Sequence, residues 1–376
     1  MKNILYIRPD ESSKSGIRKY SDVFMSAVSK YALNEFCLTD LNEHLVGCDS
    51  KKDIVNRIDS LLRNGFFNDF DIILAEIGLS EDREYFIYQL IKRKAQQLDC
   101  YVVLHDAPKT IVNHISALKS VQDNFLVRVF RKTFNETVGR LLDNAFLKSN
   151  NKKIIVFSRD AKKILHKKGI EANFLPLMSF YEISEKNQIM QYKAGDEIIL
   201  GFCGFIAAHK GLDILIDASI ELLQKGVPLK VVIGGEPLTK KDRNYLDEQV
   251  DKINKAGFYE RIKFLGYIDD EAMPNFFQSI HLLVLPYRSI GTSSSSGPLK
   301  WARSFYLPVL LSRSNVFKDE SEAESIFFNE SSSHDLFYKV ESLYNGVLII
   351  DYDHLKTTTN TYSQPVVIEG LKCIIQ

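Results

Sequence analysis

The chain has 376 residues, 45% of them hydrophobic, which is enough for two domains of roughly 150 to 200 residues, each with its own core. Its 48 lysines and arginines equal its 48 aspartates and glutamates, so net charge gives no support to a nucleic-acid or anionic-membrane partner. No apolar run reaches the roughly 18 residues of a membrane span, and the first strand lacks the features of a signal peptide. Five scattered cysteines without a Cys-x-x-Cys pair exclude a cysteine-rich zinc site and predict reduced, mostly buried thiols in a cytoplasmic protein.

The first half alternates short apolar runs with helical patterns, which predicts a parallel α/β sheet. Strands are expected at 4–7, 71–75, 100–104 and 153–157, and helices at 20–31, 85–97, 124–147 and 160–168. Ser158 is predicted to cap the last of these helices and Gly169 to end it. The segment 180–196 is polar and has no period, so we place a domain boundary there.

The second half repeats this alternation. Strands are expected at 198–205, 229–233, 262–265, 281–285 and 307–311, and helices at 211–225, 240–256, 270–278, 298–305 and 333–345. A polar stretch of threonines then leads to a closing helix within 362–376. We predict two α/β sheets facing each other across a cleft, with domains at 1–180 and 197–350, a linker at 181–196, and a tail at 351–376 that packs back on the first domain.

One strand–turn–helix segment has the pattern of a phosphate site. The buried strand breaks at Gly204, and Lys210-Gly211 follows at the start of an amphipathic helix. Free N–H groups, the positive end of the helix dipole and the lysine charge would all attract a phosphate there. A surface lysine before a helix is an interpretation of equal weight on spacing alone.

Three further sites follow predicted strands, where open α/β sheets bind ligands. Gly234-Gly235 forms a sharp turn, which is as compatible with an empty turn as with a ligand. The run from Gly291 to Pro298 places hydroxyls and amides at a helix start, and we favour an anion cradle over a flexible linker. His105, beside Asp106, is either catalytic or structural, with neither favoured.

Two basic or polar segments of the first half leave alternatives open. The loop 12–20, which contains Gly16, has the composition of a segment that closes over a ligand. The predicted helix with Arg128, Arg131, Lys132 and Arg140 presents one of two kinds of face. It is either a basic face that approaches lipid headgroups or binds an anionic acceptor, or an ordinary solvated face. We favour the solvated face.

The second half contains an ordered series of motifs between Gly204 and Leu310, within the length of one domain. The series consists of Gly204-Phe205-Ile206, Lys210-Gly211, Ile233-Gly234-Gly235, Ile262 to Ile268, Leu283 to Pro286, Ser295 to Leu299 and Leu307 to Leu310. It resembles the donor-binding domain of retaining GT-B glycosyltransferases of the group 1, or family 4, type. In the first half the match is looser and rests on Ser15-Gly16-Ile17, His105-Asp106 and Ile155 to Ser158.

The resemblance implies two Rossmann-like domains, acceptor-side and donor-binding, that transfer a sugar from a nucleotide diphosphate to an acceptor hydroxyl with retention. It implies surface polysaccharide or glycoconjugate synthesis with a glycan or lipid-linked glycan acceptor, and a cytoplasmic location, with peripheral contact at the membrane's inner face left open. No metal, cofactor or nucleic acid is expected. His105 and Lys210 take catalytic roles, and the donor-binding set is Gly16, Gly204, Phe205, Gly234, Tyr267, Ile268, Ser294, Ser295, Ser296, Gly297 and Trp301.

The chain departs from this family's pattern in three places. Phe205 stands where an arginine is typical, and Ser293 and Trp301 stand where two glutamates are typical. Trp301 either stacks on the ligand or packs in the core, and we favour the core. The alternatives to an active glycosyltransferase are a catalytically silent GT-B protein that binds a nucleotide sugar or acts as a subunit of another glycosyltransferase, and, more weakly, a nucleotide-sugar epimerase.

Overall fold

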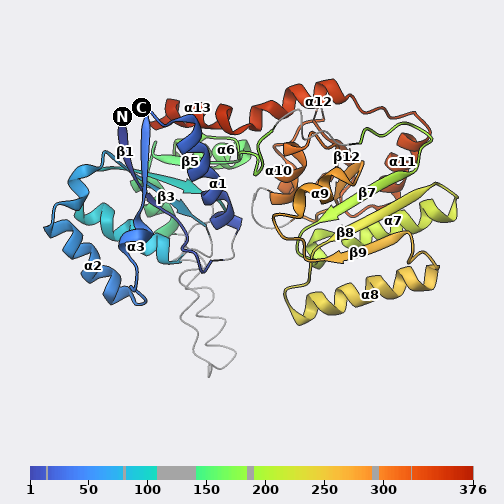
Figure 1. The fold of residues 1–376 in the computed structure, drawn as a ribbon, viewed down its shortest axis with the longest axis horizontal. Helices are drawn as coiled ribbons and strands as arrows, with labels where there is room; N and C mark the ends of the chain where they lie inside the picture. Colours follow the sequence, from blue (N-terminus) through green and yellow to red (C-terminus); the bar gives the residue numbers. More distant parts are fainter. Residues whose placement is uncertain are drawn as a thin grey trace. The chain divides into compact units, whose positions relative to one another are not determined.

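The computed structural model describes residues 1–13, 16–78, 82–107, 141–183, 190–289, 296–322 and 324–375, which form two compact units (Figure 1). Unit 1 contains the described residues of 1–176 together with those from Val367 onward. Unit 2 contains the described residues of 177–366. Each unit has a six-stranded sheet and its own buried apolar core.

The sheet of unit 1 has the strand order β2-β1-β3-β4-β5-β6, with every adjacent pair parallel. Its strands are β1 (Lys2–Ile7), β2 (Phe36–Asp40), β3 (Ile72–Ile77), β4 (Asp99–Leu104), β5 (Ile154–Val156) and β6 (Ala172–Phe174). Its helices include α1 (Gly16–Tyr31), α2 (Lys51–Arg63), α3 (Asp82–Lys94) and α6 (Arg159–Lys167). Because all strands are parallel, their carboxyl ends share one edge, where His105 follows β4.

The sheet of unit 2 has the order β12-β11-β10-β7-β8-β9 and is also parallel throughout. Its strands are β7 (Ile198–Cys203), β8 (Leu229–Gly234), β9 (Ile262–Gly266), β10 (Leu282–Leu285), β11 (Val309–Ser312) and β12 (Ile326–Phe328). Its helices include α7 (Leu212–Gln224), α8 (Lys240–Ala256), α9 (Met273–Gln278), α10 (Gly297–Ser304), α11 (Ser333–Tyr344) and α12 (Tyr352–Thr359). A last helix, α13 (Gln364–Ile375), begins in unit 2 and continues into unit 1.

Local sequence explains why these elements end where they do. Ser158 accepts a hydrogen bond from the amide of Ala161 and caps α6, as predicted. Gly169, with φ +72°, follows α6 after Lys168. α7 buries seven residues against the sheet, which accounts for its wide apolar face.

Several sequence predictions are wrong in detail. β7 ends at Cys203 and not at Phe205, because Gly204 takes φ +133°, a value that side-chain-bearing residues avoid. Gly16 is the first residue of α1, so much of the predicted loop 12–20 is helical. The polar stretch of threonines, for which no helix was predicted, contains most of α12. The thiols are not mostly buried, since Cys37 and Cys373 are exposed.

Candidate functional site

Glycine turns follow β7 and β8 at the carboxyl edge of the unit 2 sheet. Gly204 and Gly235 have φ of +133° and +140°. A Cβ on Gly235 would lie 1.9 Å from the carbonyl oxygen of Gly204, so the two turns touch through their backbones. A Cβ on Gly234 would lie 2.2 Å from Cδ1 of Ile268, so the end of that side chain would have to shift to make room for it. The edge is therefore built from backbone, which a ligand can approach closely.

Lys210 is held beside this edge by a close approach of two segments. It ends a short 3-10 helix, η4 (Ala208–Lys210), and Gly211 follows with φ +72°. A Cβ on Gly211 would lie 1.9 Å from the carbonyl oxygen of Pro286, which follows β10. The Lys210 ammonium lies 3.9 Å from the centroid of the Tyr287 ring. This cation–π contact fixes the lysine side chain on the segment after β10.

Arg288 ties the same segment to the start of α7. Its guanidinium donates two hydrogen bonds to the Asp213 carboxylate, at 2.6 and 3.0 Å, and its amide donates to the carbonyl of His209. Burial raises the pKa of Asp213, but hydrogen bonds from Arg288 and Tyr245 outweigh burial and hold that pKa below its ordinary value. Asp213 therefore stays ionised at neutral pH, and the pair braces the turn that carries Lys210.

The start of α10 faces the same edge. Ser296 caps the helix by accepting a hydrogen bond from the amide of Leu299, and Pro298 stands in its first turn. The Pro298 ring lies 3.6 Å from the point where a Cβ on Gly204 would be. The free N–H groups and positive dipole end of α10 are thus beside Gly204 and suit an anion. The predicted residues Ser294 and Ser295 lie outside the described residues.

The remaining predicted residues of unit 2 differ in their exposure. Tyr267 is 67% exposed and Phe205 is also exposed, so both side chains are accessible to a ligand. Ile268 is buried against Gly234. Trp301 is buried, and its ring lies parallel to that of Phe277 at a centroid distance of 6.0 Å. The tryptophan therefore packs in the core of unit 2, as we favoured.

After its first turn, α10 contributes buried charged residues to an ionic cluster that was not predicted from the sequence. Arg303 pairs with Glu320 and Glu324, and Tyr362 donates a hydrogen bond to Glu324. Lys300 is also buried, and burial lowers its pKa to about 8. The cluster anchors α10 from the side away from its cap.

In unit 1, His105 lies in a buried polar chain. Its Nε2 is 2.6 Å from Oε2 of Glu76, and the hydroxyl of Tyr6 donates to Oε1 of the same carboxylate at 2.7 Å. Glu76, on β3, is fully buried. The rings of Tyr20 and Phe157 contact His105 edge-on. Burial and the Glu76 charge raise the pKa of Tyr6 well above its ordinary value, so its hydroxyl remains a donor.

Sequence reasoning missed Glu76, although a signal was present. It is the single charged residue in the strand Ile72–Ile77, whose every residue is buried. A buried carboxylate needs a partner of high polarity. A search for the nearest strand-end histidine would have paired Glu76 with His105.

Gly16, a predicted donor-binding residue, is the first residue of α1. A Cβ placed on it would have no heavy atom within 4 Å.

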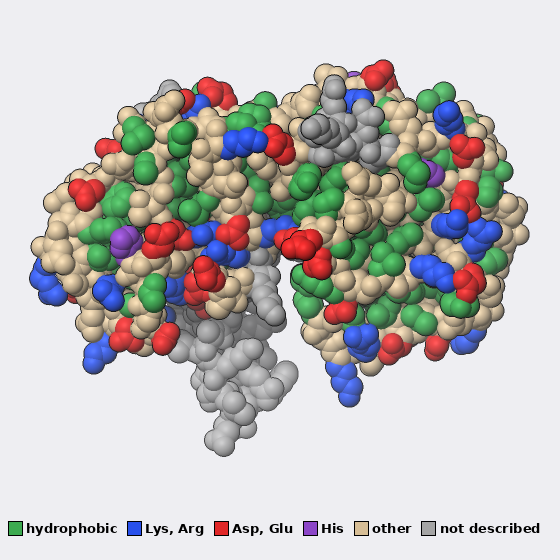
Figure 2. All heavy atoms as spheres, viewed as in Figure 1, with side chains coloured by type: hydrophobic (Ala, Val, Ile, Leu, Met, Phe, Trp, Pro, Cys, Tyr) green, Lys and Arg blue, Asp and Glu red, His purple; other side chains and the backbone are tan. Residues whose placement is uncertain are grey.

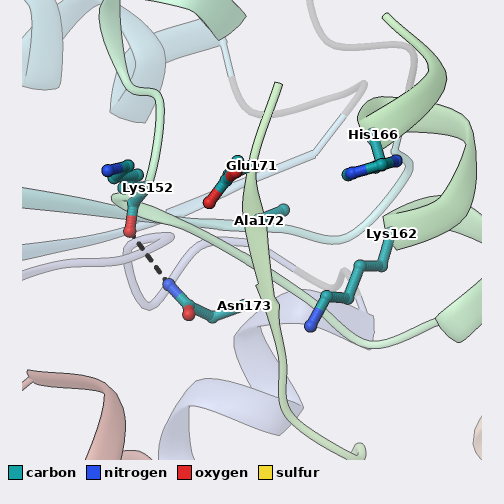
Figure 3. A pocket seen from close by; sticks show the side chains of 6 residues that line it. All are labelled: Lys152, Lys162, His166, Glu171, Ala172 and Asn173. Atoms are coloured by element: carbon teal, nitrogen blue, oxygen red, sulfur yellow. Dashed lines mark hydrogen bonds between the residues drawn. The ribbon is translucent and has the colours of Figure 1, made fainter. Parts of the chain in front are cut away.

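A separate pocket lies at the amino ends of β5 and β6, away from His105. Figure 3 shows the Lys162 and His166 side chains, both from α6, on one side of the β6 segment. The Lys152 carbonyl accepts a hydrogen bond from the Asn173 amide there. Its lining mixes both charge signs, in Lys152, Lys162, His166, Glu171, Ala172 and Asn173. On the face shown in Figure 2, acidic and basic side chains are likewise interspersed.

Two searches of the described residues gave negative results. No group of His, Cys, Asp or Glu side chains within them is arranged to hold a metal ion. Among the helices that they form, none is both long and apolar enough to cross a bilayer. The basic positions Arg128, Arg131, Lys132 and Arg140 fall outside the described part of the chain.

Comparison with known proteins shows that part of unit 2 is similar in sequence to a family of glycosyltransferases. Residues 197–345 match the family model described as glycosyl transferases group 1. Mannosylfructose-phosphate synthase of Agrobacterium fabrum is 27% identical over 114 residues, which are 29% of this chain and 25% of that protein. Alpha-D-kanosaminyltransferase of Streptomyces kanamyceticus is 31% identical over 98 residues, 26% of this chain and 24% of that protein. The matches span about a quarter of the length of these curated relatives.

Solved structures resemble the chain over its whole length. The crystal structure of HepE from Anabaena in complex with UDP has a TM-score of 0.62 and 13% identity, covering 100% of this chain and 98% of that one. At this identity the likeness shows the fold alone. The predicted fold class, GT-B with two Rossmann-like domains, is confirmed.

Proposed function

We propose that this protein is a glycosyltransferase that moves a sugar from a nucleotide diphosphate donor to an acceptor hydroxyl, with retention at the anomeric carbon. One observation carries the proposal: Gly204, Lys210 and the first turn of α10 converge at the carboxyl edge of the unit 2 sheet. That edge lies within the segment that matches the group 1 family model. UDP in the HepE structure supports a nucleotide donor of this kind.

The proposed mechanism follows from where charge develops. As the glycosidic bond to the diphosphate breaks, negative charge grows on the leaving phosphate. The Lys210 ammonium and the N–H groups at the start of α10 would stabilise that charge, since both are fixed before the donor arrives. The exposed side chains of Tyr267 and Phe205 would flank the nucleotide.

In unit 1, His105 would contact the transferred sugar, and Glu76 would orient the imidazole ring of His105. The acceptor that we propose is a glycan or a lipid-linked glycan, used in surface polysaccharide or glycoconjugate synthesis. Peripheral contact with a membrane belongs to the same proposal, because a lipid-linked acceptor would lie at a membrane. On the face shown in Figure 2, acidic and basic side chains are interspersed.

A second candidate function is a catalytically silent protein that binds nucleotide sugars. The buried stack of Trp301 on Phe277 favours it, because no carboxylate stands at that position of α10. Phe205 adds an exposed apolar ring where the resembling enzymes carry an arginine. Neither residue can neutralise a leaving phosphate.

A panel of nucleotide sugars distinguishes the two candidates. We expect the purified protein to hydrolyse or transfer one donor, and Lys210→Ala to abolish that turnover. Lys225→Ala is the matched control, because this lysine also lies over an aromatic ring, 4.2 Å from that of Phe337, but follows the other end of α7. Thermal stabilisation by a donor without any turnover, even with acceptors present, would support the silent protein.

A further inference from the structure

Tyr287 presents an unsatisfied polar atom in the core of unit 2. The residue is 2% exposed, and its hydroxyl has no hydrogen-bond partner among the described residues. Leaving a buried hydroxyl unpaired lowers the stability of the fold. Buried tyrosine hydroxyls are normally paired, so this one calls for an explanation.

The unpaired hydroxyl lies among the parts of the proposed phosphate site. It is 3.8 Å from the point where a Cβ on Gly204 would be, and the Pro298 ring is 3.6 Å from the same point. The Lys210 ammonium lies over the Tyr287 ring. The hydroxyl, the lysine and the start of α10 therefore surround one small region at the end of β7.

The backbone and ring of Tyr287 are held in place. Its carbonyl accepts a hydrogen bond from the hydroxyl of Ser312, and its ring packs against Phe317 at a centroid distance of 5.2 Å. Tight packing on both sides keeps the hydroxyl from turning to another partner. Among the described residues the hydroxyl therefore has no partner, and a ligand at the end of β7 would satisfy it.

We propose that the Tyr287 hydroxyl donates a hydrogen bond to a diphosphate oxygen of the donor, while its ring positions Lys210. This inference rests on the proposed function and adds one binding residue to the same site. A hydroxyl donating to a phosphate oxygen makes a charge-assisted bond, which is stronger than one between neutral groups. It supplies a donor at a site where Phe205 offers none.

Tyr287→Phe tests the hydroxyl alone, because the ring that carries Lys210 is kept. Titration calorimetry with UDP, GDP and ADP first identifies the nucleoside diphosphate that the wild type binds best. For that probe we expect Kd to rise about 10- to 100-fold in Tyr287→Phe. Binding of the parent nucleoside, which has no phosphate, is expected to stay unchanged.

The unliganded variant gives a second readout. Because Tyr287→Phe removes an unpaired buried hydroxyl, its Tm without ligand should equal or exceed that of the wild type. A Tm lowered by several degrees would reveal a structural role and overturn the inference. Tyr192→Phe is the control, since this buried tyrosine packs against His281, just before the amino end of β10, and its substitution should not alter binding of the chosen nucleoside diphosphate.

The outcomes separate this inference from the proposed function. A Kd for Tyr287→Phe within twofold of the wild type, with Lys210→Ala still weakening binding, overturns the role of Tyr287 alone. Failure of the wild type to bind any of the three nucleoside diphosphates overturns both.

Discussion

At the scale of single residues, the buried carboxylate of Glu76 decides how His105 can act. The carboxylate accepts from Tyr6 and contacts Nε2 of the imidazole, which favours a proton on that nitrogen. The other ring nitrogen, Nδ1, is then the one left for a ligand. Glu76 touches no substrate in this account, so it is a positioning residue.

Glu76→Gln is expected to lower kcat for sugar transfer by about tenfold or more, because an amide no longer fixes the histidine proton on Nε2. The ¹⁵N resonances of the His105 ring should report a changed tautomer in the same variant. Tyr6→Phe keeps the carboxylate and should leave the tautomer unchanged. Wild-type ring resonances together with wild-type kcat in Glu76→Gln would contradict the role.

Lys300 gives a pH-dependent prediction. Burial lowers its pKa in the folded protein to about 8 from 10.5, so the unfolded chain binds more protons between these pH values. Its contribution therefore destabilises the fold fully below pH 8 and fades as pH rises toward 10.5. Glu320, Glu324 and Asp319 act to raise this pKa and Arg303 acts to lower it, but burial dominates.

Lys300→Met should raise the free energy of unfolding by about 3 kcal/mol at pH 7. The difference from the wild type should shrink by pH 10, which urea denaturation at the two pH values would show. An equal difference at both pH values would mean that the lysine is not buried in its charged form.

At the scale of elements, the glycine before α7 sets the approach of two segments. Gly211→Ala would place a Cβ 1.9 Å from the Pro286 carbonyl oxygen, in addition to the cost of φ +72°. Gly226, which closely follows the same helix, has φ +83° and nothing within 4 Å of such a Cβ. An alanine would be strained by the positive φ at both positions, but its Cβ would clash with a neighbouring atom only at position 211.

We therefore expect Gly226→Ala to cost about 1 kcal/mol of stability and Gly211→Ala clearly more. Gly211→Ala should also weaken binding of the nucleoside diphosphate, since it displaces Lys210 from Tyr287. Chemical denaturation and calorimetry check the two effects. Equal losses in the two variants would show that the close approach to Pro286 is not present in solution.

The long apolar strands and α8 were predictable, because buried parallel strands read as continuous apolar runs and α8 has a capping threonine and a terminal glycine. The short edge strands β2, β6 and β12 were not, since three to five residues give too little pattern. α12 was hidden by its threonines, which are poor helix formers held in place by an Asp351 cap. Tertiary contacts, which a sequence window does not contain, settle such segments.

The candidate site was predictable only where backbone chemistry defined it. Gly204, Lys210 and the start of α10 follow from strand–turn–helix patterns. Glu76 and Tyr287 did not, because their roles depend on partners, or on missing partners, that are distant in sequence.

At the scale of the whole molecule, the chain completes unit 1 with its last residues. α13 carries the chain from unit 2 into unit 1 (Figure 1). Lys2 donates to the carbonyl of Ile375, and Lys372 pairs with Glu35 at 2.6 Å. Leu371 is buried on the same helix. The stability of unit 1 therefore depends on residues at both ends of the chain.

Leu371→Ala should cost unit 1 about 2–5 kcal/mol, whereas Val366→Ala, at an exposed position of α13, should change little. Hydrogen exchange resolves the two units, and we expect faster exchange in β1, β3 and β4 than in the wild type, with β7 and β8 unchanged. Equal loss of protection in both sheets would show that the units do not unfold separately.

The proposed function depends on binding of the donor diphosphate at the carboxyl edge of the unit 2 sheet. A crystal structure of the full chain with a nucleoside diphosphate bound tests it most directly. We expect the diphosphate between the Lys210 ammonium and the first turn of α10, with an oxygen within hydrogen-bond distance of the Tyr287 hydroxyl. A diphosphate bound elsewhere, with Lys210 and Gly297 free of it, would overturn the proposed site.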